Sequence, residues 1–271
     1  MASNEADSHK TAVKSGSLTI VGTGIQLAGQ ITLAAKAWIE QAEKVLFAVA
    51  DPLTAVWLQE LNPTAEPLHI DKSHSTRRAM YQDFVDQILA AVQEGQRVCA
   101  VFYGHPGVLT DPAHATITAV RAAGYPAKML PGISADACLY ADLGIDPGRH
   151  GCQQFEATDF LIRHRRFDPN SVLILWQIGV IGNRTLDTDE PNREGLAVLT
   201  EVLQRWYPTE HEVVVYETAV YATNKPLIAP LPLDSLPNGR ISKISTLYIP
   251  PLTQSTIDEA MMVRLKMTTP D

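Results

Sequence analysis

The chain has 271 residues, of which 45% are hydrophobic and 19% charged, and its formal net charge is −8. This composition is typical of a globular protein and lacks the basic clusters with which nucleic-acid-binding proteins contact phosphates. The three cysteines, Cys99, Cys138 and Cys152, show no Cys-x-x-Cys spacing, which argues against a zinc site and a disulfide framework. No apolar run reaches the roughly 20 residues of a membrane span, and the sequence therefore indicates a cytoplasmic protein.

The first half of the chain predicts an α/β domain. Residues 1–16 are polar and are expected to form a disordered tail. After this tail, strands are expected at 17–21, 45–49, 97–103 and 127–130, and helices at 31–43, 52–61, 75–94 and 112–123. Ser75 is the expected N-cap of the third helix, and Gly95 the expected residue just beyond its end. Alternation of strands and helices is typical of a mainly parallel sheet.

The second half has fewer helices between its strands. Strands are expected at 172–176, 212–216 and 245–249, with one helix at 195–206. This pattern predicts a mixed sheet in a second domain. The expected division of the chain is a tail at 1–16, an N-terminal domain at 17–135, a C-terminal domain at 136–251 and a C-terminal tail at 252–271. The last segment has an amphipathic helical pattern that suits contact with a dimer partner or a peptide.

Three expected strands end in glycine loops, which are Gly22-Thr-Gly24, Gly104-His-Pro-Gly107 and Pro131-Gly132-Ile-Ser134. Parallel sheets bind ligands beyond the carboxyl ends of their strands. The dinucleotide fingerprint fails because its third glycine, Gly29, comes two residues late, and none of the loops contains a lysine or arginine for a phosphate. The loops therefore predict backbone contact with an uncharged or zwitterionic ligand, such as an adenosine that carries an amino acid.

Three side chains near these loops have two interpretations each. His105 is either a ligand-binding residue or, as is commoner for a lone loop histidine, a structural hydrogen-bonding residue. Arg77 and Tyr81 are four residues apart and share one helix face. A guanidinium can hold a carbonyl oxygen and a phenol can bind or relay a proton. The alternative is a surface arginine beside a half-buried tyrosine.

The loop sequences resemble a known family. Val21-Gly-Thr-Gly24, Tyr103-Gly-His-Pro-Gly107 and Leu130-Pro-Gly-Ile-Ser-Ala135 are similar to motifs of the tetrapyrrole methylase superfamily of S-adenosylmethionine-dependent methyltransferases. Most of its members carry an aspartate in place of His105. The longer pattern of FYGHPGV, AKMLPGISADACLYADLGIDP, LWQIG and ISTLYIPP resembles the borosin peptide α-N-methyltransferases, particularly the bacterial split type. The similarity runs from about Gly16 to Pro251.

The resemblance implies a two-domain α/β class III methyltransferase fold with S-adenosyl-L-methionine in the cleft between the domains. It implies methylation of backbone amides of a ribosomally made precursor peptide, with S-adenosyl-L-homocysteine as product. The expected assembly is a homodimer, or a heterotetramer with the precursor. Binding of nucleic acid, a membrane or a metal ion is not expected. Because the chain stops 20 residues after Pro251 without a hydrophobic core peptide, we expect the precursor to be supplied in trans.

The resemblance also assigns residues. The cofactor contacts that it implies are Gly24, Ile25, Tyr103, His105, Val108, Leu109, Ser134, Ala135 and Gln177. Arg77 and Tyr81 match the catalytic arginine and second tyrosine of the family. The family also has a tyrosine several residues before this arginine, but residues 68–76 contain none. His69, Asp71 and His74 are the candidates to replace it; the alternatives are that the chain is weakly active or acts on another substrate.

Three other functions are kept as alternatives. One is methylation of a tetrapyrrole or another small molecule on the same fold. Another is a catalytically weak homologue that binds the cofactor and a peptide without turnover. A nicotinamide-dependent oxidoreductase is disfavoured by the spacing of the glycines.

Overall fold

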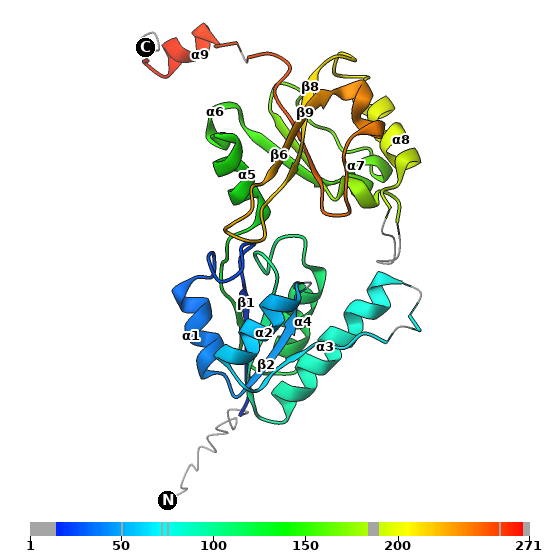
Figure 1. The fold of residues 1–271 in the computed structure, drawn as a ribbon. Coiled ribbons are helices and arrows are strands. Elements are labelled where there is room, and N and C mark those ends of the chain that lie inside the picture. The colour runs from blue at the N-terminus through cyan, green and yellow to red at the C-terminus, as the bar shows by residue number, and fades with distance from the viewer. Residues whose placement is uncertain are drawn as a thin grey trace, which may run out of the picture. The chain divides into compact units, whose positions relative to one another are not determined.

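The computed structural model describes residues 15–49, 51–71, 73–74, 76–183, 190–254 and 256–267. These residues form two compact units (Figure 1). The first unit contains the described residues up to Ala135 together with Val220–Asn224, and the second contains Asp136–Ala219 and the described residues from Lys225 onward. Fourteen of the sixteen residues of the expected N-terminal tail lie outside the described ranges.

The first unit is built on a five-stranded parallel sheet with the strand order β3-β2-β4-β1-β5. Its strands are β1 (Ser17–Gly22), β2 (Lys44–Ala48), β3 (Ala65–Pro67), β4 (Arg97–Phe102) and β5 (Ala127–Met129). The parallel sheet confirms the expectation from the sequence. The short edge strand β3 was not predicted, because three residues are too few to show a period.

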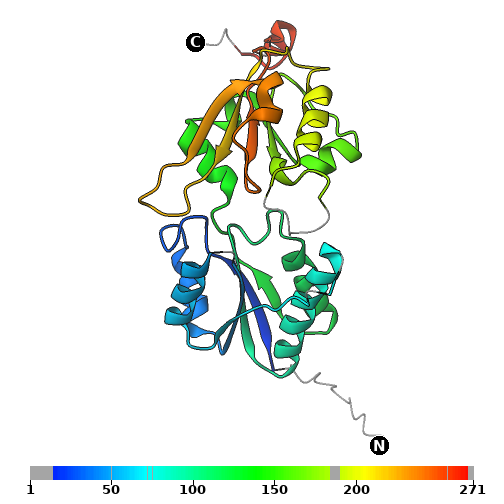
Figure 2. The same ribbon diagram turned by 45° about the vertical axis from the view of Figure 1, so that its right-hand side comes forward.

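Helices cover both faces of this sheet (Figure 2). They are α1 (Leu33–Gln41), α2 (Pro52–Leu61), α3 (Arg77–Gln93) and α4 (Asp111–Ala122). Along β1, Leu18 and Ile20 pack in one buried cluster with α3 and α4, whereas Val21 packs in another with α1 and α2. Side chains of a strand point alternately to its two faces. Both faces are therefore buried, as is usual for parallel sheets.

The ends of α3 match the sequence expectations in part. Ser75, the expected N-cap, lies outside the described residues. The N-cap of the described helix is Thr76, whose hydroxyl accepts the backbone N–H of Ala79 at 3.3 Å. Gly95 follows the helix with a φ of +92°, a left-handed conformation that glycine adopts at little cost.

The second unit holds a five-stranded mixed sheet with the order β6-β7-β10-β8-β9. Its strands are β6 (Cys152–Glu156), β7 (Val172–Trp176), β8 (Glu212–Glu217), β9 (Leu227–Pro232) and β10 (Thr246–Ile249). Only β6 and β7 are parallel among the described pairs, and the others are antiparallel. The mixed sheet agrees with the sequence expectation.

Helices in the second unit are mostly short. They are α5 (Ala135–Leu143), α6 (Pro147–His150), α7 (Ala157–Ile162), α8 (Arg193–Leu203) and α9 (Glu259–Arg264), with 3-10 turns η1 (Ile178–Val180) and η2 (Leu233–Asn238). The largest apolar cluster joins the sheet to α7, α8 and η2. The amphipathic pattern near the end of the chain corresponds to α9, which exposes Met261 and Val263. Among the described residues, no helix has the length and apolar character of a membrane span.

Candidate functional site

Two glycine loops of the first unit are bonded to each other through their backbones. The N–H of Gly104 donates to the carbonyl of Gly24 at 3.0 Å, and the N–H of Gly24 donates to the carbonyl of Gly104 at 3.3 Å. A Cβ added to Gly22 would lie 2.0 Å from the oxygen of Gly104, and one added to Gly132 would lie 3.1 Å from the same oxygen. The three loops therefore meet around one carbonyl group, and the contact at Gly22 leaves no room for a side chain.

His105 has a structural role within its loop. Its Nδ1 accepts the backbone N–H of Gly107 at 2.9 Å. The ring of His114 in α4 contacts the carbonyl of Gly107, with Nε2 and the oxygen 2.9 Å apart. Because Nδ1 of His105 accepts a hydrogen bond, a neutral His105 ring carries its proton on Nε2. The hydrogen-bonding interpretation of His105 is supported, and its Nε2–H is a donor group that a ligand could use.

The same loop exposes large apolar side chains. Tyr103, Val108 and Leu109 have exposed fractions of 42%, 39% and 52%. Leu109 also has a φ of +52°, a left-handed conformation that is uncommon for a branched residue and that clusters at functional sites. A strained backbone that presents apolar groups at the carboxyl edge of a parallel sheet is typical of a ligand-binding loop.

The loop after β1 is held by two contacts that the sequence did not predict. The side-chain oxygen of Gln30 accepts the backbone N–H groups of Ile25 and Gln26, each at 3.0 Å. The N–H of Leu27 donates to the carbonyl of Val220 at 2.9 Å. Residues 220–224 belong to the first unit although they follow β8 in sequence. No local pattern could reveal a partner almost 200 residues away.

Residues 220–224 are also held by a side chain. The hydroxyl of Tyr221 donates to Oδ1 of Asp51 at 2.5 Å. Asp51 is the N-cap of α2, where its other oxygen accepts the N–H and the hydroxyl of Thr54, each at 2.8 Å. The bond from Tyr221 is the main reason why the pKa of Asp51 lies below its usual value. Asp51 thus joins α2 to the segment that holds the loop after β1.

The remaining predicted cofactor residues lie at two places. Ser134 is buried and Ala135 is the first residue of α5, directly after the loop that contains Gly132. Gln177 lies in the second unit, at the end of β7, and has a left-handed φ of +60°. Among the predicted residues, the structure brings Gly24 and Ile25 into one connected group with the 103–109 loop. The cofactor role of all of them stays a prediction.

The strand before Gln177 is fixed by a polar group. The indole N–H of Trp176 donates to Oε1 of Gln154 at 3.1 Å, and the side-chain N–H of Gln154 donates to the hydroxyl of Tyr140 at 2.6 Å. Burial raises the pKa of Tyr140 well above its usual value. Tyr140 is therefore neutral at physiological pH and acts as a structural link between α5 and β6.

The predicted catalytic pair lies on α3. Arg77 is the first residue of the helix, and its side chain lies outside the described structure. Tyr81 is half-buried against the cluster beneath α3, and its ring centroid is 6.4 Å from that of Phe84. The two residues are four positions apart in a continuous helix, as predicted, and their catalytic role stays a prediction. Tyr81 also contributes to packing.

The start of α3 lies at the same edge of the sheet as the glycine loops. The segment before α3 follows the carboxyl end of β3, and α3 then leads back to the amino end of β4. Because all five strands are parallel, their carboxyl ends share one edge. The described ranges contain no group of three or more His, Cys, Asp or Glu side chains that could hold a metal ion.

Replacing Gly22 by alanine is expected to destabilise the protein. The new methyl group would meet the oxygen of Gly104 at 2.0 Å, and overpacking of this kind costs about 1–3 kcal/mol of the free energy of unfolding. The matched control is Gly29→Ala in the same loop, where the nearest atom is the end of the Gln26 side chain at 3.3 Å. Urea unfolding followed by circular dichroism measures both. Equal stability of the two variants would contradict the close contact.

Tyr221→Phe is expected to loosen the loop after β1. It removes the hydrogen bond to Asp51, and the amide hydrogen of Leu27 should exchange about fivefold faster, equivalent to about 1 kcal/mol. The amide of Leu130, which donates to the carbonyl of Ile20 in β1, is the internal control.

The effect of Tyr221→Phe on the exchange of the Leu27 amide should also depend on pH. The hydrogen bond from the Tyr221 hydroxyl lowers the pKa of Asp51 in the folded protein. Its stabilisation is therefore present above the unfolded pKa of about 3.9 and is lost as the pH falls through the lower folded value. The difference between wild type and Tyr221→Phe should vanish in acid. Unchanged exchange at Leu27 at neutral pH would show that Tyr221 does not hold the loop.

Residues 17–234 match the family of Tetrapyrrole (Corrin/Porphyrin) Methylases. The fold is similar to that of uroporphyrin-III-C-methyltransferase from Thermus thermophilus, with a TM-score of 0.65 and 18% identity over 88% of this chain and 93% of that chain. It is also similar to that of cobalt precorrin-4 methyltransferase, with a TM-score of 0.61 and 18% identity over 86% of this chain and 94% of that chain. These structures confirm the predicted fold class.

Two curated relatives have higher sequence identity. One is a methyltransferase and ribosomally synthesized cyclic peptide gymnopeptides precursor from Gymnopus fusipes, 40% identical over 96% of this chain and 63% of the relative. Another is a methyltransferase and omphalotin A precursor from Omphalotus olearius, 38% identical over 95% of this chain and 63% of the relative. The chain thus spans slightly less than two thirds of the length of these relatives.

Other relatives carry the borosin name, such as a type III borosin cyclic peptide precursor from Anomoporia bombycina, which is 38% identical over 93% of this chain and 30% of the relative. The resemblance to the tetrapyrrole methylase superfamily and to the borosin methyltransferases is confirmed. The chain belongs to the tetrapyrrole methylase family, and within it is similar to the borosin methyltransferases.

Proposed function

We propose that the chain is an S-adenosylmethionine-dependent methyltransferase that methylates backbone amides of a ribosomally made precursor peptide. The observation that carries this proposal is the meeting of three glycine loops around the carbonyl of Gly104, in a chain whose relatives are named as methyltransferases and peptide precursors. We propose further that the peptide is supplied in trans, in the cytoplasm, and that S-adenosylhomocysteine is the second product.

The loop residues suit the cofactor. The three loops offer backbone polar groups, the apolar side chains of Val108 and Leu109, and the Nε2–H donor of His105. They contain no lysine or arginine, so they suit an adenosine and an amino acid better than a phosphate. When bound, S-adenosylmethionine supplies an electrophilic methyl group on a sulfonium.

Each predicted cofactor residue has a proposed part in this site. The backbone of Gly24 and Ile25 forms its floor, and the 103–109 loop forms a wall. Ser134, Ala135 and Gln177 complete the set of contacts that the resemblance implies.

The acceptor poses the harder chemical problem. A peptide amide nitrogen is a poor nucleophile and its N–H a very weak acid. The protein must therefore hold the amide in line and stabilise negative charge on its oxygen. Positioning can contribute roughly 7–11 kcal/mol. In the proposed site Arg77 is the cation that faces the amide oxygen, and Tyr81 orients the amide or relays its proton.

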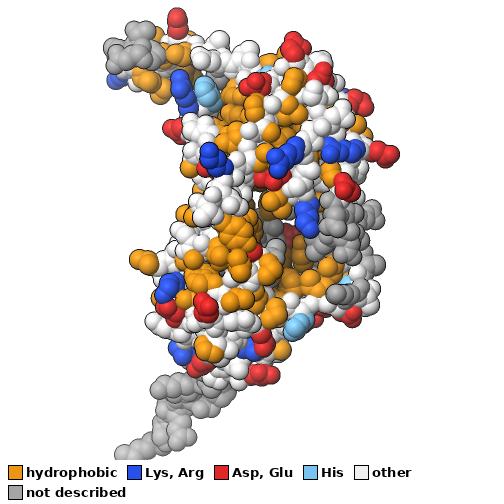
Figure 3. Space-filling model, viewed as in Figure 1, with side chains coloured by type: hydrophobic (Ala, Val, Ile, Leu, Met, Phe, Trp, Pro, Cys, Tyr) orange, Lys and Arg blue, Asp and Glu red, His pale blue; other side chains and the backbone are white. Residues whose placement is uncertain are grey.

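An exposed apolar surface supports a homodimer. On the first unit, apolar side chains gather on the face that carries α1 and α2 (Figure 3). Leu33 and Leu53 have exposed fractions of 87% and 56%, and Trp38 and Val56 are also exposed. Contiguous apolar patches are typical of contact surfaces. We propose that two copies of the chain associate, and that a heterotetramer forms when each binds a peptide.

The proposed activity predicts methylation of a separate peptide. The full chain, co-expressed with a small neighbouring reading frame that encodes a hydrophobic tail, should add one or more methyl groups to that peptide. Fragmentation in the mass spectrometer should place them on backbone nitrogens. Arg77→Ala should lower the rate by about 10²–10³ through lost oxyanion stabilisation, whereas Arg77→Lys, which keeps the cation, should lower it less.

Other outcomes separate the alternatives. A peptide that binds but never gains a methyl group would contradict catalysis and support a binding protein. Methylation of a porphyrinoid and not of the peptide would contradict the peptide substrate and support a small-molecule methyltransferase. Methyl groups found only on the enzyme chain itself would contradict supply in trans.

A further inference from the structure

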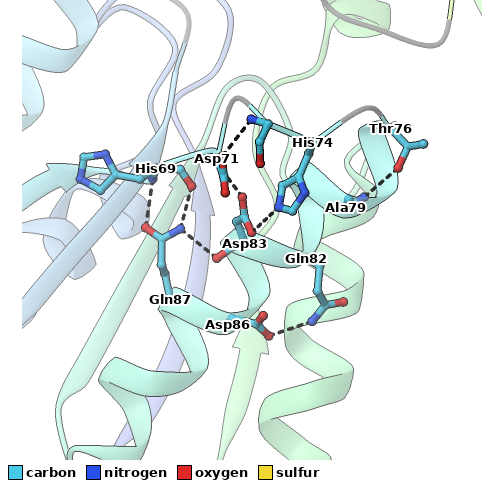
Figure 4. Close-up of polar contacts among 10 residues, drawn as sticks. His69, Asp71, His74, Thr76, Ala79, Gln82, Asp83, Asp86 and Gln87 are labelled. Atoms are coloured by element: carbon cyan, nitrogen blue, oxygen red, sulfur yellow. Dashed lines mark hydrogen bonds and ion pairs between the residues drawn. The ribbon is translucent and has the colours of Figure 1, made fainter.

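The segment between β3 and α3 contains a histidine paired with a carboxylate (Figure 4). Nε2 of His74 lies 3.1 Å from Oδ1 of Asp83, and the side chains are 32% and 24% exposed. The other carboxylate oxygen of Asp83 accepts the backbone N–H of Asp71 at 2.9 Å. Asp83 is therefore oriented by the chain that carries His74, and His74 is oriented by Asp83.

This contact determines which nitrogen of the His74 ring carries the proton. The backbone N–H of Asp71 and the ring of His74 hold the pKa of Asp83 below its usual value, so Asp83 is ionised at neutral pH. A carboxylate only accepts hydrogen bonds, and Nε2 of His74 must therefore carry the proton. A neutral His74 then has its lone pair on Nδ1. A carboxylate-oriented imidazole with a free lone pair is the usual arrangement of a histidine base.

His69 and Asp71, the two other candidates to replace the missing tyrosine, make different contacts. The backbone N–H and carbonyl of His69 are both bonded to the side chain of Gln87, at 3.0 and 2.7 Å, and the His69 ring points away from Asp83 (Figure 4). The carboxylate of Asp71 accepts the backbone N–H of Ser73 at 2.8 Å and shapes the turn. Of these three residues, His74 is the one whose ring is oriented by a carboxylate.

The position of the pair suits a reaction at the sheet edge. His74 lies three residues before Arg77, where the chain enters α3 at the carboxyl edge of the parallel sheet. Asp83 lies in α3 and contacts the segment before the helix through the backbone of Asp71 and the ring of His74. The carboxylates of Asp71 and Asp83 both interact electrostatically with His74.

We propose that His74 is the base that accepts the proton of the peptide amide, and that Asp83 is its positioning residue. This inference rests on the proposed function. The amide N–H bond breaks and its proton moves to Nδ1 of His74. The nitrogen forms the new N–CH3 bond while the S–CH3 bond breaks and its electron pair stays on sulfur. The imidazolium, held by Asp83, later releases its proton to water.

The rate test uses the full chain with S-adenosylmethionine and the co-expressed peptide. His74→Gln should slow single-turnover methyl transfer by about 10²–10⁴, with calorimetric binding of S-adenosylmethionine unchanged. His150→Gln on α6 is the matched control and should keep the wild-type rate. Added imidazole should restore part of the rate of His74→Ala, which a purely structural histidine would not allow.

A second measurement does not depend on turnover. Long-range ¹H–¹⁵N spectra of the ring nitrogens should show the Nε2–H tautomer for His74 in the wild type. Asp83→Asn should shift the tautomer populations and slow methyl transfer without weakening S-adenosylmethionine binding. A dominant Nδ1–H tautomer in the wild type would overturn the pairing.

The outcomes distinguish the two proposals. If the wild type methylates the peptide and His74→Gln does so at full rate, the base role is wrong and the proposed function stands. If the wild type methylates no peptide amide, the proposed function fails and the base role fails with it. A slow His74→Gln variant that imidazole rescues supports both.

Discussion

The carbonyl oxygen of Gly104 occupies the space that a side chain on Gly22 would need, 2.0 Å from the position of its Cβ. This contact allows the strand ends of β1 and β4 to turn toward each other, and the paired bonds between Gly24 and Gly104 then join their loops. Gly132 approaches the same oxygen. The site on the first unit depends on this contact, because a side chain at Gly22 would separate the loops.

Other groups hold the two loops that this contact joins. His105 folds back on Gly107 and sets the shape of its loop, while Gln30 and the segment 220–224 hold the opposite loop. The parallel order of the strands places the start of α3 at the same edge. The cofactor contacts proposed in the first unit and the His74–Asp83 pair thus belong to one edge of one sheet. The loops present backbone and apolar groups, whereas the start of α3 presents charged and titratable ones.

Much of this could be predicted from the sequence, because the helices are long and the strand ends are marked by glycines. The parallel sheet, the mixed second sheet and the meeting of the glycine loops all follow from such local signals. What could not be predicted depends on distant contacts. The bond from Leu27 to Val220, the bond from Tyr221 to Asp51 and the pairing of His74 with Asp83 join residues whose spacing has no period. The elements β3, α5, α6, β6, α7 and β9 were also missed. Of these, β3 and α6 have only three or four residues, which cannot show a pattern.

We propose that the glycine edge of the first unit binds S-adenosylmethionine through its backbone and apolar groups. Calorimetric titration of the full chain with S-adenosylmethionine, with NAD titrated in parallel, tests it most directly. Saturable binding of S-adenosylmethionine and no binding of NAD are expected. Alanine at Gly104, whose φ is +71°, should weaken the binding in a protein that remains folded. Binding of NAD without binding of S-adenosylmethionine, or full affinity in Gly104→Ala, would contradict it.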